Sequence, residues 1–549
     1  MTDTDIETRT IAKGTFWGLA GGFAFKIMSF LYTVILARFF SQEDVGTFYL
    51  ALSVFYSLAI LSDLGLNTAF ARYVPYYIGK GEKRKAYALL IGSYIYCGIL
   101  SIALSALLFL SAGIASEAFK NPNLYSAMAI MALLPVFSSI SAINISFITG
   151  LKMVKEVNLA NNLQQVVKLA LMLGALFLVG ANVSVITGSF LASFVFLTGI
   201  SFWYLGRGMK HHEISRETST FGEKTGLLKE AASLGVALAV VSGVSTLVFY
   251  TDRLMLGYML PAEGSAEAIA IYSMAVSVAL LIPIFPGAVI SIFGPVMAEL
   301  YGKGKKSSMD IISRTSIRWY ILLLAPLSLA FITFPTELMS LLYGSAYAPG
   351  GIILAIATIG MFARMLSSVH SSILSSMRIV RVELYIGLVA LALNVVGNLA
   401  MIPMYGMTGA ILVSAFSMAV ASVMMMYFCK RIFGSSFIGE TVKPVLSFTL
   451  ALAVLWISRG LFSDAFRAVS LVSLPVGGLS GLVLLKLVHL AILGVVALVA
   501  GLLFFLFLIA LKSFKEEDLS MAFGFLRRAK APSGAIKLVG RIMRYGIAG

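Results

Sequence analysis

Three basic residues of this sequence stand inside apolar stretches that are long enough to cross a membrane. Lys26, Lys168 and Arg364 each lie within a run of about 20 mostly apolar residues. A charged side chain at the centre of a bilayer costs about 2.5–3.5 kcal/mol, so each of these residues needs polar surroundings. Lys and Arg bind phosphate and pyrophosphate oxygens well. These residues therefore predict a water-filled cavity within the membrane that attracts anions.

Each cation continues a stripe of small or polar residues along one face of its helix. The stripes, at steps of three or four residues, are Gly18, Gly22, Lys26, Ser29 and Thr33; Asn158, Asn161, Gln165 and Lys168; and Gly360, Arg364, Ser367, Ser371 and Ser375. We predict that the cavity is lined by Lys26, Arg364, Lys168, Asp63, Asn67, Asn394 and Asn398. The alternative is a buried ion pair that holds helices together, with Asp63 as the partner.

The other polar residues of the apolar stretches suggest less chemistry. Asp252 and Arg253 fall near an outer helix end, where we expect them to pair with water or with neighbouring residues. Cys97 and Cys429 lie in or beside apolar runs and indicate neither a disulfide nor a metal site. No pattern predicts a catalytic residue, a metal ion or a cofactor.

The composition is that of an all-α integral membrane protein. Of the 549 residues, 59% are hydrophobic and 12% are charged, whereas soluble proteins have roughly 25% charged residues. Apolar runs recur from end to end, and we count about 14 transmembrane helices. They include a second helix over 45–74 and an eighth over 268–297. The polar start of the chain lacks the basic, cleavable pattern of a signal peptide, so we expect the first apolar run to remain a helix.

The chain repeats itself. The sequence GKGEK at 79–83 returns 223 residues later as GKGKK at 302–306, and Tyr49 returns as Tyr272 within a similar apolar segment. Each copy is long enough for six helices, and two such halves can rock around a site between them. The predicted parts are a six-helix lobe over 1–205, a cytosolic linker over 206–230, a second, pseudo-symmetric lobe over 231–430, two further helices over 431–512 and a basic cytosolic tail over 513–549.

Basic residues are concentrated in every second connection between the predicted helices. With the N-terminus in the cytosol, the inner segments hold roughly 31 of the 41 Lys and Arg residues and the outer loops about five. This bias predicts that both termini are cytosolic, and it explains most of the net charge of +16. The charges are spread over many short loops, which indicates membrane orientation rather than nucleic-acid binding.

Three segments resemble those of polysaccharide flippases. LARFFSQEDVG at 36–46 resembles their first outer loop, SDLGLNTAFARY at 62–73 the end of their second helix, and YTDRLMLG at 250–257 the end of their seventh. By these segments the chain is identified as a member of the multidrug/oligosaccharidyl-lipid/polysaccharide (MOP) flippase superfamily, in its polysaccharide biosynthesis or O-antigen flippase branch. The helix count and the duplication extend the resemblance over nearly the whole chain.

The resemblance implies a transporter rather than an enzyme. It implies a flippase that moves a lipid-linked, pyrophosphate-bearing oligosaccharide across the plasma membrane by alternating access, for assembly of cell-surface polysaccharide or glycan. The implied partners are this substrate, membrane lipids and glycan polymerase or glycosyltransferase machinery, with the flippase itself a monomer. No cofactor is implied, and the coupling ion is left open between Na⁺ and H⁺.

Other functions stay open at this point. A MATE-like ion-coupled multidrug exporter would usually have twelve helices and an acidic cavity for organic cations, whereas a lipid II type flippase has fourteen helices. A membrane glycosyltransferase or ligase would need catalytic carboxylates or His near a water-facing domain, and the outer loops here are short. A scramblase or structural membrane protein without a specific cavity is a further alternative.

A basic helix is expected near the C-terminus. Lys537, Arg541 and Arg544 are spaced so that a helix over 534–545 gathers them on one face. The other side would carry Ile536, Val539, Ile542 and Met543. Such a helix can lie on the inner leaflet with its cations near anionic headgroups. The alternative is a loosely ordered tail.

Overall fold

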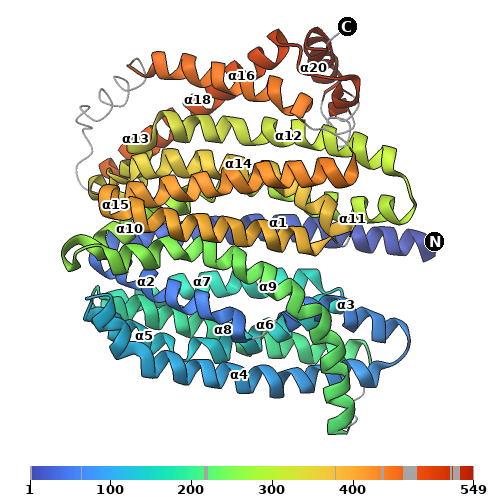
Figure 1. Ribbon diagram of the computed structural model, residues 1–549, viewed down its shortest axis with the longest axis vertical. Helices are drawn as coiled ribbons and strands as arrows, with labels where there is room; N and C mark the ends of the chain where they lie inside the picture. Colours follow the sequence, from blue (N-terminus) through green and yellow to red (C-terminus); the bar gives the residue numbers. More distant parts are fainter. Residues whose placement is uncertain are drawn as a thin grey trace. The chain divides into compact units, whose positions relative to one another are not determined.

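The computed structural model describes residues 3–62, 65–214, 220–377, 379–434, 438–460, 479–519, 522–523 and 532–547. In these residues the regular structure is helical throughout, apart from one isolated bridge between Phe514 and Ile547 (Figure 1). Ten helices of this part are long and apolar enough to cross a membrane. The all-α membrane class is therefore confirmed, whereas the count of about fourteen spans is not.

The second and eighth predicted helices are both interrupted in the structure. In the first copy, α2 (Gln42–Ala59) is followed by the 3-10 turn η1 (Ile60–Ser62) and α3 (Leu66–Gly79). Gly65 before α3 has a φ of 77°, which favours glycine. In the second copy, α10 (Ala262–Ala279) is followed by α11 (Ile284–Gly302).

The sequence repeat is visible in the helix boundaries. The helices α3 and α11 end 223 residues apart, at Gly79 and Gly302. The next helices, α4 (Lys83–Ala118) and α12 (Lys306–Thr333), begin with the same offset. Glycines with positive φ, Gly81 and Gly304, form the turn in both copies.

The chain divides into two compact units, each with residues from separate parts of the sequence. Unit 1 comprises Met1–Ser277 and Gly387–Val413, and unit 2 comprises Val278–Ile386 and Ser414–Gly549. The lobe and linker boundaries expected from the sequence stay predictions.

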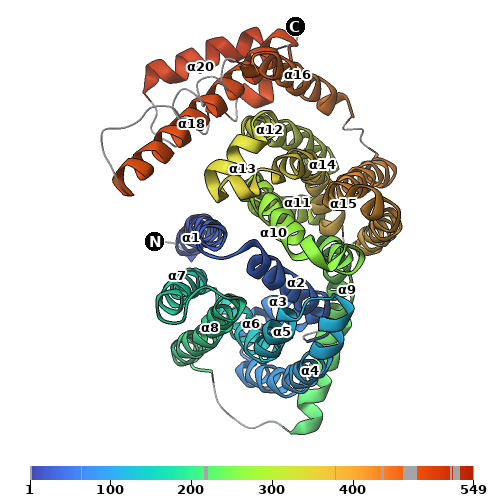
Figure 2. The same ribbon diagram turned by 90° about the vertical axis from the view of Figure 1, so that its left-hand side faces the viewer.

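In unit 1 the helices form a bundle. Its further helices are α1 (Asp3–Phe39), α5 (Asn123–Met131), α6 (Leu134–Gly150), α7 (Val154–Val179), α8 (Val183–His211) and α9 (Phe221–Met259). Helix α7 packs against α1 and α8, while α6 packs against α3, α4 and α8 (Figure 2). A buried core with Phe70, Leu89 and Phe147 joins α3, α4 and α6. This packing positions the cations of α1 and α7 described below.

In unit 2 the central helix is α12, which packs against α14, α16 and α18. The further elements are α13 (Pro335–Tyr343), η2 (Ser345–Tyr347), α14 (Gly350–Ser376), α15 (Val380–Phe433), α16 (Ile438–Ile457), α18 (Leu479–Ala510) and α20 (Ser533–Tyr545). Helix α15 is kinked at Gly406, where φ is 55° and ψ is −133°, and its central part belongs to unit 1. The predicted helix near the C-terminus is confirmed as α20.

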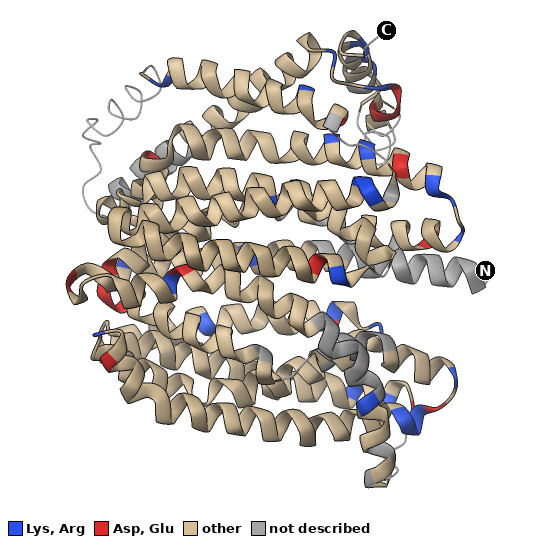
Figure 3. Cartoon of the chain, in the orientation of Figure 1, with Lys and Arg blue, Asp and Glu red and all other residues tan. Residues whose placement is uncertain are grey.

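Charged residues lie mostly toward the helix ends, and few lie along the middle of the described helices (Figure 3). Lys303, Lys305 and Lys306, for example, are exposed at the turn between α11 and α12. This distribution is typical of helices that cross a membrane. The cytosolic location of the termini stays a prediction.

Candidate functional site

Lys26 lies on an open side of α1. It is exposed and has no hydrogen bond or ion pair with the residues that the structure describes. Gly21 instead faces α7, where a Cβ would come within 2.4 Å of Asn158 Oδ1 and where Asn162 Nδ2 donates to the Gly21 carbonyl oxygen at 3.1 Å. A Cβ at Gly22, one turn before Lys26, would meet no atom of the described residues outside its own helix within 4 Å. The predicted stripe is therefore accessible along this part of α1.

Lys168 is buried between α1, α7 and α8. It is 5% exposed, and its Nζ lies 4.1 Å from the ring centre of Tyr32 and 5.6 Å from that of Phe190. Among the described residues it has no carboxylate partner. Among the described residues, the buried Tyr32 hydroxyl and Gln165 Oε1 also have no hydrogen-bond partner. Lys168 thus lies against aromatic ring faces rather than beside a carboxylate of the described chain.

Arg364 lies on α14 and is also exposed. It has no ion pair within the described part of the chain. Further along its stripe, Ser371 and Ser375 both donate to Glu383 Oε1 of α15, the latter at 2.9 Å. A Cβ at Gly360 would lie 3.0 Å from the Cα of Ala415, so this end is closely packed. On one side of Arg364 the stripe packs against α15, and on the other side it forms hydrogen bonds, whereas the Arg364 guanidinium has no ion pair with the described residues.

The remaining predicted residues divide into two groups. Asp63 lies outside the described residues, as does the side chain of Asn67. Asn394 and Asn398 are both fully buried and do share one face of α15, as expected. Lys26 and Lys168 belong to unit 1 and Arg364 to unit 2.

A buried polar cluster in unit 1 joins α9, α10 and α15. Asn394 and Asn398 each donate through Nδ2 to Asp252 Oδ1, at 3.0 and 2.8 Å. The Tyr272 hydroxyl donates to Asp252 Oδ2. Asp252 is 2% exposed, and the buried side-chain oxygen of Asn398 accepts no hydrogen bond from the residues that the structure describes. The two asparagines thus donate to the carboxylate of Asp252, a residue that we expected near a helix end.

Arg253 completes this region with a second buried charge. It is 3% exposed, and its Nε donates to Ser273 Oγ at 2.8 Å. Its guanidinium carbon lies 5.0–6.0 Å from the ring centres of Tyr49, Phe249, Tyr250 and Tyr272. The two tyrosines related by the repeat therefore face the same arginine. Of the two partners that we expected for Asp252 and Arg253, water or neighbouring residues, the structure shows protein groups: hydrogen bonds for both and ring faces for Arg253.

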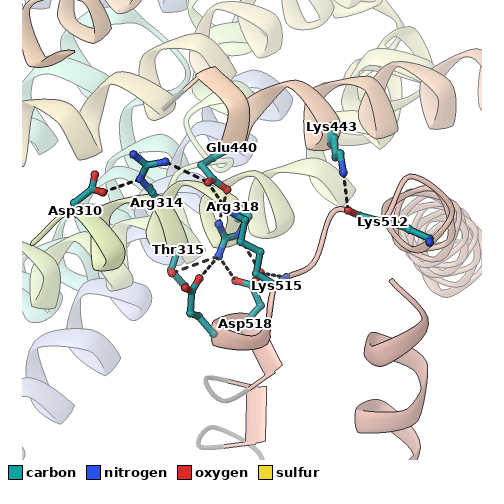
Figure 4. A network of polar contacts seen from close by, with 10 residues as sticks. Asp310, Arg314, Thr315, Arg318, Glu440, Lys443, Lys512, Lys515 and Asp518 are labelled. Atoms are coloured by element: carbon teal, nitrogen blue, oxygen red, sulfur yellow. Dashed lines mark hydrogen bonds and ion pairs between the residues drawn. The ribbon is translucent and has the colours of Figure 1, made fainter. Parts of the chain in front are cut away.

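An ion-pair network in unit 2 joins α12, α16 and the segment that follows α18 (Figure 4). Arg318 donates to Asp518 from Nε at 2.9 Å, and it also pairs with Glu440 and with Glu517. Glu440 also forms an ion pair with Lys515. The side chains of Arg318, Glu440 and Asp518 are 6%, 7% and 2% exposed. Because these buried charges are paired with one another, we interpret the network as structural rather than as a substrate site.

This network was not predicted from the sequence, although the sequence contains a signal for it. Asp310, Arg314 and Arg318 recur at steps of four residues along α12, and Arg314 Nε donates to Asp310 at 2.9 Å. This spacing places the three charged side chains on one face of α12, and that face leads into an apolar run. A charge in such a position requires a buried partner. The partners come from segments more than 120 residues away in sequence.

Metal-binding groups are not found in the described part of the chain, where no three His, Cys, Asp or Glu side chains could hold an ion together. Cys97 and Cys429 are both buried. His211 and His212 stack with ring centres 5.1 Å apart at the end of α8. Partial burial, together with the nearby charges of His211 and Lys83, lowers the pKa of His212.

Two known proteins with similar sequences are named for the biosynthesis of polysaccharide or glycan. The family model described as polysaccharide biosynthesis protein matches residues 11–301, and the MatE model matches residues 237–400. The chain is 23% identical to the capsular polysaccharide biosynthesis protein CapF of Staphylococcus aureus, over 74% of this chain and 96% of that protein. It is 22% identical to the probable low-salt glycan biosynthesis flippase Agl15 of Haloferax volcanii, over 72% of this chain and 79% of that protein.

Solved structures of transporters share the fold. The lipid II flippase MurJ in an inward closed conformation is 14% identical, covers 89% of this chain and 99% of its own, and has a TM-score of 0.65. An inward-facing multidrug resistance MATE transporter is 13% identical, covers 77% and 94%, and has a TM-score of 0.60. Since the polysaccharide biosynthesis model covers more than half of the chain, this protein belongs to that family, within the MOP superfamily of flippases and transporters.

Proposed function

We propose that this transporter is a flippase for a lipid-linked oligosaccharide whose sugar and lipid are joined by pyrophosphate. The observation that carries the proposal is that Lys26, Lys168 and Arg364 lie in membrane-spanning helices without a carboxylate partner among the described residues. Such positions cost about 2.5–3.5 kcal/mol each, and the oxygens of a pyrophosphate are ligands that Lys and Arg bind strongly. The names of CapF and Agl15 support a glycan as the cargo.

The exposed cations are the proposed phosphate ligands. Lys26 and Arg364 are both accessible and unpaired within the described chain, so they can exchange water for phosphate oxygens at low cost. Lys168, with the Tyr32 hydroxyl and Gln165 beside it, would contact further polar groups of the substrate. Asp63 and Asn67 remain part of the proposed cavity on sequence grounds.

The Asp252 cluster is the proposed site of the coupling cation, either Na⁺ or H⁺. A hard cation prefers oxygen ligands, and the cluster contains the Asp252 carboxylate together with the Asn398 Oδ1 that has no donor. Protonation would equally change the three hydrogen bonds that Asp252 accepts. Asn394 and Asn398 are thereby assigned to coupling rather than to direct substrate contact.

The transport cycle is proposed to be alternating access at the plasma membrane, with both termini cytosolic and the protein acting as a monomer. Glycan polymerase or glycosyltransferase machinery would supply and consume the lipid-linked glycan. The topology can be tested with Tyr545→Cys, because Tyr545 is 74% exposed whereas both native cysteines are buried. A membrane-impermeant thiol reagent should label this variant in inverted vesicles and leave it unlabelled in intact cells.

The cargo can be tested in proteoliposomes with a fluorescent lipid-diphosphate-sugar, whose movement between leaflets is followed by chemical quenching. Lys26→Gln and Arg364→Gln should each slow its translocation by more than tenfold, since removing a charge-assisted contact costs about 1.5–3 kcal/mol. Both variants should keep the unfolding temperature of the wild type, because Lys26 and Arg364 are exposed and have no ion pair with the described residues. Lys152→Gln, which removes an exposed cation from the turn before α7, is the matched control.

Three outcomes would contradict this proposal. Wild-type translocation by both variants would show that these cations do not bind the cargo. Equal movement of fluorescent phosphatidylcholine would favour a scramblase. Accumulation of an organic cation against its gradient would favour the MATE-like exporter, although Asp252 at 2% exposure is poorly placed to bind a bulky cation.

A further inference from the structure

The C-terminal helix α20 is attached to unit 2 by its apolar side. Val539 and Met543 pack into the core cluster that contains Phe504 and Leu508 of α18. The main-chain N–H of Phe514 donates to the Gly546 carbonyl oxygen at 3.0 Å, which fixes the end of α20 beside the end of α18. This part of the apolar side is covered by protein rather than left for lipid, so we look to the opposite face for a function.

The opposite face of α20 forms a basic groove. Lys537, Arg541 and Arg544 are exposed and have no ion pair with other described residues. The groove has a volume of about 760 Å³, and the described residues that line it are Phe523, Gly534, Lys537, Gly540, Arg541, Arg544 and Tyr545. This volume is within the usual range of small-molecule sites. The described lining contains three cations and no carboxylate.

One wall of the groove depends on a glycine. A Cβ at Gly540 would lie 2.5 Å from Phe523 Cζ, so the aromatic ring can rest against α20 only because residue 540 has no side chain. The groove thus combines an apolar wall with a row of cations. An anionic group attached to an apolar chain matches both features.

The depth of the groove indicates where its ligand comes from. The apolar stretch of α18 ends at Ala510, and a Cβ at Gly546 would lie 3.1 Å from the Cα of Ile509. The end of α20 therefore lies where α18 leaves the hydrocarbon region, which is the level of the lipid headgroups. Exposed tyrosines are frequent at this level, and Tyr545 is 74% exposed.

We propose that this groove binds the headgroup of an anionic phospholipid from the adjacent leaflet. The phosphate lies between Arg541, Arg544 and Lys537, and the start of the acyl chains lies against Phe523. Binding at this site is independent of the transported cargo. It differs from the general attraction of a basic helix to a membrane because it is saturable and depends on the shape of the groove.

The test is native mass spectrometry of the purified full-length protein, titrated with dioctanoyl phosphatidylglycerol or dioctanoyl phosphatidylcholine. The wild type should retain one phosphatidylglycerol molecule in preference to phosphatidylcholine. The triple variant K537Q/R541Q/R544Q should weaken this binding roughly 100-fold, since each cation near an anionic surface contributes about fivefold in affinity. The control K303Q/K305Q/K306Q removes the same charge from the exposed α11–α12 turn and should bind normally.

A second variant tests the shape of the groove without changing its charge. Gly540→Ala displaces Phe523 and should weaken phosphatidylglycerol binding at least fivefold; if it unfolds early on heating, Phe523→Leu alters the same wall. Equal loss in both triple variants, or no loss in the wall variants, would show diffuse attraction and overturn the proposal. Displacement of the lipid by inorganic phosphate at equal concentration would overturn it too, because the site would then serve a free anion.

Discussion

Substituting Arg318 by methionine would leave buried carboxylates without their shared cation. The guanidinium pairs with Glu440, Glu517 and Asp518, and of these Glu440 and Asp518 are less than a tenth exposed. Breaking a buried ion pair from one side costs about 3–5 kcal/mol. Glu440 keeps Lys515 as a partner, whereas Asp518 keeps the Lys515 main-chain N–H at 2.9 Å. We therefore expect the lower end, about 3 kcal/mol.

The assay is denaturant-induced unfolding of the detergent-purified protein, with the double variant R318M/D518L beside the single one. Replacing both partners by apolar residues removes the stranded charge, so the double variant should be more stable than R318M alone. Lys303→Met is the control, because its ion pair with Glu299 is exposed and screened by water, so its loss should change the stability far less than R318M does. A loss of under 1 kcal/mol in R318M, or simple additivity in the double variant, would refute the assignment of this network to stability.

Three further predictions concern unit 1. Gly46→Ala should destabilise the protein by about 3 kcal/mol or more in thermal unfolding, because its Cβ would lie 1.7 Å from the Ala266 carbonyl oxygen. Its control is Gly98→Ala, whose Cβ would meet no described residue, and which should stabilise α4 by about 0.5–1 kcal/mol in the same measurement. Asp252→Asn should abolish the response of transport to whichever imposed gradient, Na⁺ or pH, drives the wild type, and retention of that response would contradict the coupling role. Lys168→Met should slow transport more than tenfold, with an unfolding temperature equal to or above that of the wild type because a buried charge is removed; a fall in both would indicate a structural lysine.

The sequence predicted the class and the family because both depend on local patterns. Apolar runs, the 223-residue repeat and three short segments were enough to predict an all-α flippase of the MOP superfamily. The shared helix face of Asn394 and Asn398 was predicted correctly, because residues four apart lie on the same side of a helix. Their partner Asp252 was not, since it lies 142 residues earlier in the chain and no local pattern joins the two segments.

The number of membrane spans is not confirmed, and one reason is physical. Hydropathy alone does not show where a helix is interrupted, as it is between α2 and α3 at η1 and Gly65. The Arg318 network was missed in a similar way, because its charges come from α12, α16 and the residues after α18. Long-range pairing of this kind depends on the packing of helices, which a single sequence does not specify.

The separation between Asp252 and its asparagines also has a consequence for biosynthesis. A ribosome adds about 5–20 residues each second, so the 142 residues from Asp252 to Asn394 correspond to roughly 7–28 s of synthesis. Helix α9 is thus made well before two of the donors to its carboxylate exist, while Tyr272 follows within 20 residues. The buried polar contacts of α9 can therefore be completed only after α15 has been translated.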